Sequence, residues 1–74
     1  MMDVNSTLKQ LGMEYEESIT IQKEIIKKNR ERLAQAMKKH NFKEVQRLNS
    51  LLKTLYEEKW ELEEMAVEIR RYLS

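Results

Sequence analysis

Cysteine and proline are both absent from this 74-residue chain, and glycine occurs once, at Gly12. Without cysteine there can be no disulfide framework and no thiolate zinc site, which is compatible with a cytoplasmic protein. Without proline, no residue strongly interrupts a helix. The chain also lacks an excess of one charge, since its formal net charge is +1, so overall charge gives no argument for nucleic-acid binding.

Long hydrophobic runs are missing as well, because the longest is Met65-Ala66-Val67. A membrane-spanning helix needs about 20 apolar residues, and the first residues lack the basic and apolar regions of a signal peptide. We therefore expect a cytoplasmic protein without a membrane segment. Charged residues make up 36% of the chain and apolar residues 41%, which is typical of a helical or coiled-coil domain rather than of a disordered segment.

The first predicted helix covers residues 7–39. Thr7 and Gln10 form a capping-box pattern at its start. At 100° per residue, one arc of about 120° contains apolar residues and no charge. The residues in this arc are Leu8, Leu11, Tyr15, Ile19, Ile25, Ile26, Leu33, Ala36 and Met37. Gly12 weakens the first turns, so we expect fraying there; the alternative is a close approach of a second helix.

The second predicted helix covers residues 43–73 and follows a turn at residues 40–42. Asn41 and Glu44 form another capping-box pattern. A short turn between two long helices makes them antiparallel neighbours. The predicted fold is therefore an all-α, coiled-coil-like helical hairpin that forms one domain over residues 1–74.

A heptad repeat runs along the second helix, with Lys59 as its one polar member. Its positions are Val45, Leu48, Leu52, Leu55, Lys59, Leu62, Ala66, Ile69 and Leu73. Pairing about the turn places residue i opposite residue 81 − i, so that Gln22 faces Lys59. Lys59 and Asn29 could each specify register or dimer orientation; alternatively, Lys59 extends toward Glu63.

Further apolar residues lie on both flanks of this repeat. Leu51, Met65 and Tyr72 are on one flank, and Phe42, Tyr56, Trp60 and Val67 are on the other. One hairpin cannot cover both, and a monomer of this size has a marginal core. We expect an antiparallel homodimer, a four-helix bundle, with either flank at its interface. The candidate interface residues are Leu51, Tyr56, Trp60, Met65, Val67 and Tyr72.

The charges are unevenly distributed. Residues 23–53 hold ten basic and three acidic residues, a balance of +7, and the remaining residues have a balance of −6. The turn end of the hairpin is therefore basic and its open end acidic. This could align two hairpins head to tail, or attract nucleic-acid phosphates. The candidates for the basic end are Lys27, Lys28, Arg30, Lys38, Lys39, Lys43 and Arg47.

Catalytic, metal-binding and cofactor-binding patterns are not found. His40 is the single histidine, whereas a zinc site needs several ligands and four-helix carboxylate sites use Glu-x-x-His pairs. Trp60 could stack on a nucleobase, but the sequence places no second aromatic with it in a basic groove. The expectation is therefore a non-enzymatic protein–protein interaction module that self-associates, and the alternative is a nucleic-acid-binding accessory protein.

The segment Glu44-Val45-Gln46-Arg47-Leu48-Asn49, after a basic helix and a short turn, resembles the small helical-hairpin phosphatases that act on a sporulation response regulator. That family has a Ser-Gln-Glu-Leu-Asp signature, where this chain reads Asn49-Ser50-Leu51-Leu52-Lys53. The serine is replaced by Asn49 and the aspartate by Lys53, so the phosphatase activity is the least favoured function. Hairpins of this composition are common in bacteria and phage.

Overall fold

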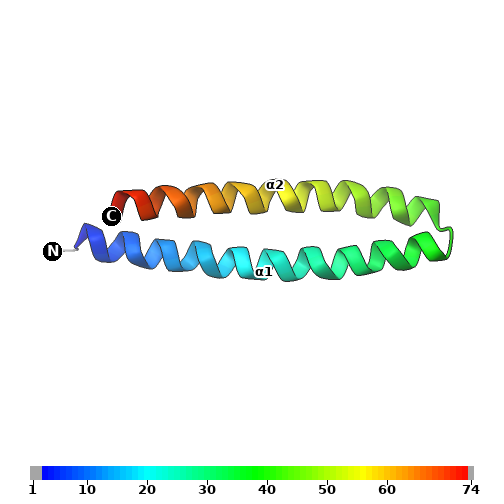
Figure 1. Cartoon of the computed structure of the whole chain (residues 1–74), viewed down its shortest axis with the longest axis horizontal. Helices are drawn as coiled ribbons and strands as arrows, with labels where there is room; N and C mark the ends of the chain where they lie inside the picture. The colour runs from blue at the N-terminus through cyan, green and yellow to red at the C-terminus, as the bar shows by residue number, and fades with distance from the viewer. Residues whose placement is uncertain (1–2, 74) are drawn as a thin grey trace.

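The chain forms a long antiparallel helical hairpin in the computed structural model, which describes residues 3–73. Helix α1 spans Val4–Lys38 and helix α2 spans Phe42–Leu73. The two helices lie side by side along the length of α2, and the start of α1 and the end of α2 lie at the same end of the hairpin (Figure 1). The hairpin measures 58 × 18 × 14 Å. The all-α hairpin predicted from the two repeats is confirmed.

Asp3 caps the start of α1. Its carboxylate accepts hydrogen bonds from the Asn5 amide at 3.1 Å and from the Ser6 hydroxyl at 3.2 Å. The Thr7 hydroxyl donates to the Asp3 carbonyl at 3.2 Å, one turn inside the helix. The predicted cap at Thr7 is therefore wrong, and α1 starts at Val4. Aspartate is among the best N-cap residues because its oxygens satisfy amides that lack a helical partner.

The turn occupies residues 39–41, one residue earlier than expected. The Asn41 amide donates to the Ala36 carbonyl at 2.9 Å, and the His40 amide to the Met37 carbonyl at 3.1 Å. These two bonds define a Schellman motif, in which the residue after the helix adopts a left-handed conformation. That residue is His40, with φ of 54°. The Asn41 side chain then accepts from the Glu44 amide at 3.4 Å, as predicted for the cap of α2.

A heptad repeat also runs along α1, and it differs from the predicted apolar arc. Leu11, Ile25 and Met37 belong to that arc but are exposed. The residues of α1 that are buried or half-buried instead alternate steps of four and three. They are Leu8, Gly12, Tyr15, Ile19, Gln22, Ile26, Asn29, Leu33 and Ala36. Both helices therefore pack through coiled-coil positions.

Gly12 lies within α1 and faces the other helix. A Cβ atom at this position would be 3.3 Å from Cγ2 of Ile69. The helix does not fray here, contrary to our expectation, and the missing side chain makes room for Ile69. The pair also fits the predicted register, in which residue i lies opposite residue 81 − i. Ile26 and Leu55 follow the same rule and share the central core cluster with Leu52.

The polar residues of the two repeats are satisfied within the hairpin. Gln22 donates from Nε2 to the Leu55 carbonyl at 3.2 Å. Asn29, which is buried, donates to the Ile25 carbonyl of its own helix at 2.8 Å. Lys59 extends to Glu63, with 3.7 Å between Nζ and Oε1, so the alternative of an extended lysine is confirmed. Among the described residues, no buried side-chain nitrogen or oxygen lacks a hydrogen-bond partner.

Candidate functional site

The two packed repeats leave two long sides of the hairpin, and polar contacts cross both of them, two of these on the first side. Arg70 of α2 pairs with Glu16 of α1, with 2.6 Å between Nη2 and Oε1. Further along, the Arg30 guanidinium donates to the Tyr56 hydroxyl at 3.4 Å. We call this surface the polar side. It comprises Glu16, Lys23, Lys27, Arg30, Tyr56, Trp60, Glu63, Val67 and Arg70.

The opposite surface carries a row of aliphatic side chains, which helical spacing places on this side of both helices. We call it the aliphatic side and define it by Leu11, Ile21, Ile25, Leu51 and Met65. Leu51 packs against the central core cluster, and the other four remain exposed. The exposed fraction of Ile21 is 54% and that of Met65 is 43%. A polar contact crosses this side too, in which Gln22 Nε2 donates to Glu58 Oε2 at 3.0 Å.

The six candidate interface residues divide between these two surfaces. Leu51 and Met65 lie on the aliphatic side, with Tyr72 further along the same flank. Tyr56, Trp60 and Val67 lie on the polar side, where Val67 lines a groove with Glu16, Lys23, Glu63 and Arg70. The six residues therefore lie on two flanks of α2, and Met65 also lines a groove with Trp60 and Val67. The aliphatic side gains Leu11, Ile21 and Ile25 from α1.

A basic groove lies on the polar side, near the middle of the hairpin. Its lining residues are Lys23, Ile26, Lys27, Arg30, Glu31, Ala34, Tyr56 and Lys59. The Tyr56 ring also contacts the neighbouring Trp60 ring, at a centroid distance of 6.2 Å and an angle of 35°. Sequence reasoning missed this association of aromatic and basic residues. The signal was present, because Lys23, Lys27 and Arg30 recur on one helical face and the register places Tyr56 level with the turn between Lys23 and Lys27.

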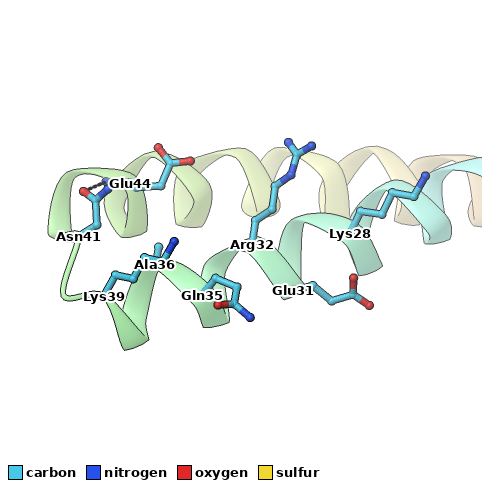
Figure 2. Close-up of a pocket in the computed structure, with 8 residues that line it drawn as sticks. All are labelled: Lys28, Glu31, Arg32, Gln35, Ala36, Lys39, Asn41 and Glu44. Atoms are coloured by element: carbon cyan, nitrogen blue, oxygen red, sulfur yellow. Dashed lines mark hydrogen bonds between the residues drawn. The ribbon is translucent and has the colours of Figure 1, made fainter.

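The predicted basic end does not form one patch. Lys28 and Lys39 line a groove near the turn together with Arg32, Glu31 and Glu44. Lys28 and Arg32 extend to the same side of α1 there, whereas Glu31 points away from them (Figure 2). Lys27 and Arg30 lie in the other groove, and Lys38 and Lys43 are exposed elsewhere. Basic residues near the turn are thus divided between two sides of the hairpin.

Arg47 is held by an acidic neighbour rather than presented to a ligand. Its guanidinium pairs with both carboxylate oxygens of Glu44, with 3.0 Å between Nε and Oε2. This hydrogen bonding, aided by the charges of Arg47 and Arg32, lowers the pKa of Glu44, while the pKa of Arg47 is raised. Both side chains therefore stay ionised over the physiological pH range.

Within residues 3–73, no group of three histidine, cysteine, aspartate or glutamate side chains is arranged to hold a metal ion. The His40 ring lies 6.2 Å from that of Phe42, in the turn. In the same part of the chain, neither helix is long and apolar enough to span a membrane. Comparison with protein-family models, curated proteins and solved structures finds no match to this chain.

Proposed function

We propose that the protein is a non-enzymatic interaction module that self-associates through its aliphatic side into a four-helix bundle. The observation that carries this proposal is the difference between the two sides of the hairpin. The Glu16–Arg70 and Arg30–Tyr56 contacts cross one side, while the other side, crossed by the Gln22–Glu58 hydrogen bond, carries a row of four exposed aliphatic residues from both helices. Met37 and Val67 on the polar side are also exposed, but they lie far apart along the hairpin. An uncovered apolar row of this kind is typical of an interaction surface.

The small core is a second reason for self-association. Among residues 3–73, seven hydrophobic residues are buried, and Leu48 is the one large side chain with no exposed surface. The accessible surface is 6261 Å², whereas a compact monomer of 9.0 kDa is expected to have about 4,850 Å². Stable interfaces bury about 800 Å² per partner. The hairpin exposes more surface than a compact monomer of its mass, and the difference is larger than the area that one partner buries in a stable interface. A second copy could therefore cover the aliphatic side.

The occupant that fits the aliphatic side best is a second copy in antiparallel orientation. In the register of the hairpin, Leu51 lies level with about residue 30 of α1, and Met65 with about residue 16. The five aliphatic residues are therefore distributed symmetrically about Ile21. Reversing one copy places Leu11 near Leu51 of the partner subunit and Ile25 near Met65 of the partner subunit. An antiparallel partner can match this row only if the row is symmetric about its centre, whereas a parallel partner needs no such symmetry.

The charges favour the same orientation. An antiparallel partner places the basic turn end of each hairpin beside the acidic open end of the other. On the aliphatic side, Lys28 then lies level with Glu14 and Glu68 of the partner subunit. A parallel partner would instead place Lys28 beside its own copy. Single exposed pairs contribute little, but like charges along a whole end disfavour the parallel form.

A pair of charge insertions tests the assigned surface. Ile25 on the aliphatic side and Val67 on the polar side have similar exposed fractions, 39% and 42%. We expect Ile25→Glu to convert a dimer of about 18 kDa into the 9.0 kDa monomer in sedimentation equilibrium at tens of micromolar. Val67→Glu is the matched control and should leave the dimer intact. A monomeric unsubstituted protein would contradict self-association, and dissociation by Val67→Glu alone would contradict the choice of side.

Nucleic-acid binding through the turn end, the alternative suggested by the charge distribution, receives less support from the geometry. Glu44 lies among the basic residues of the turn-end groove, whereas Glu31 points away from Lys28 and Arg32 (Figure 2). Glu44 also engages Arg47 directly. A phosphate backbone at this position would therefore meet the Glu44 carboxylate together with the lysines and arginines.

A further inference from the structure

The basic groove of the polar side brings together cationic side chains, which bind anions, and aromatic rings, which stack on flat groups. Four cationic side chains and one acid, Glu31, line it. Tyr56 also lines it, and its ring contacts that of Trp60, which lines the adjoining groove along α2 with Glu63, Glu64 and Glu68. We propose that this groove binds single-stranded nucleic acid, with phosphates on the lysines and arginine of α1 and a base stacked on Trp60. The inference does not depend on self-association, because the aliphatic side lies on the opposite surface.

The cations of α1 form a row along the groove. Lys23, Lys27 and Arg30 recur at steps of four and three residues, so they lie on successive turns of one helical face. Within the described residues, neither Lys23 nor Lys27 forms an ion pair, which leaves both charges for a ligand. A row of cations with this spacing follows an extended polyanion rather than a single compact charge.

Trp60 supplies a surface on which a base could stack. The Lys59 ammonium lies 5.6 Å from the centroid of the Tyr56 ring and covers that ring. The Trp60 side chain beside it is 58% exposed, and the helix register places it level with Ile21, closest to Lys23 among the cations of the row. Proteins that bind single strands without sequence preference combine a basic groove with aromatic rings in this way, because every base has a face for stacking.

An acidic peptide is the competing ligand, since carboxylates would also pair with these cations. The exposed Trp60 ring favours nucleic acid, because a flat base can stack on an aromatic ring beside the cations. A carboxylate could pair with the cations but would not stack on the ring. A duplex fits less well, because its bases are already stacked on one another and leave no free face for Trp60.

The direct test is binding of a fluorescein-labelled dT12 oligonucleotide by fluorescence anisotropy at low salt. We expect binding that quenches the emission of Trp60, the single tryptophan of the chain. With three phosphate contacts, the logarithm of the affinity should fall with the logarithm of the salt concentration with a slope of about −2. Trp60→Ala should weaken binding by roughly 5- to 150-fold, the effect of losing one stacked base.

Two neighbouring lysines provide the matched control. Lys27 lies in the basic groove and Lys28 in the turn-end groove, so Lys27→Glu and Lys28→Glu change the charge equally on different surfaces. We expect Lys27→Glu to reduce affinity for dT12 at least tenfold more than Lys28→Glu, with both variants remaining helical by circular dichroism. Equal losses, unchanged Trp60 emission, or no binding of dT12 would overturn the proposal. Tighter binding of a twelve-residue polyglutamate peptide or of a dT12–dA12 duplex would overturn it equally.

Discussion

His40 has the least favourable backbone conformation of the residues that set the turn. A left-handed φ brings the Cβ of an L-residue close to its own carbonyl, at a cost of about 1–2 kcal/mol. Glycine avoids this cost and is the usual residue at this position of a Schellman motif. The position is nevertheless occupied by histidine, which adds a ring contact with the exposed Phe42.

Replacing His40 by glycine should therefore stabilise the hairpin. We expect the free energy of unfolding to rise by about 0.5–1 kcal/mol, because the relief of strain exceeds the extra entropy of glycine in the unfolded chain. Urea unfolding followed by circular dichroism at fixed protein concentration measures the change. His40→Ala is the control, since it removes the ring but retains the Cβ, and it should give no increase. An equal increase in both variants would locate the effect in the imidazole ring instead.

At the scale of the helices, the sequence predicted α2 more completely than α1. Eight apolar residues mark the repeat of α2, so its buried face follows directly from the pattern. In α1, Gly12, Gln22 and Asn29 occupy three of the nine buried or half-buried positions. A search for apolar residues therefore selected the exposed Leu11, Ile25 and Met37 in their place. The buried face of α1 can be identified only when α1 is paired with α2. Gly12 has no apolar side chain, and it is buried because Ile69 of α2 packs against it.

The ends of the helices were also predicted only in part from the sequence. Asn41 was predicted as a cap because it precedes Glu44 by three residues, and both belong to one local motif. Thr7 has a similar local pattern, but Asp3 begins the helix one turn earlier and uses the Thr7 hydroxyl as a donor to its own carbonyl. The basic groove was missed for a different reason. Its aromatic and basic residues come from different helices, and they come together only when the predicted register is applied to their positions.

The packing of the helices predicts where truncation of a side chain is costly. Leu48 is fully buried in the repeat of α2. Leu48→Ala should lower the free energy of unfolding by roughly 2–5 kcal/mol, through lost burial and the cavity that remains. Met37→Ala on the polar side removes a side chain of similar size that is 59% exposed, and it should change stability by less than about 0.5 kcal/mol. Thermal and urea unfolding measure both, and a similar loss in the two variants would contradict the assigned core.

At the scale of the whole molecule, the hairpin is a charge dipole with one apolar side. The dipole runs from the basic turn to the acidic open end, and the aliphatic side is symmetric about Ile21. The two features are independent, since the first depends on lysine, arginine and glutamate and the second on the spacing of leucine, isoleucine and methionine. Both nevertheless favour the same antiparallel orientation of the proposed dimer.

Spin labels can test this orientation, because the chain has no cysteine of its own and a single introduced cysteine is labelled uniquely. Gln46 is exposed near the turn, and Glu57 is exposed near the middle of α2. In an antiparallel dimer, labels at Gln46→Cys should be roughly 42 Å apart along the axis, from the rise of 1.5 Å per residue. Labels at Glu57→Cys should be close together in either orientation, which controls for dissociation. Pulsed electron resonance that finds Gln46→Cys labels as close as those at Glu57→Cys would indicate a parallel dimer. Self-association would then stand, while the inference from charge and from the symmetry of the aliphatic side would be wrong.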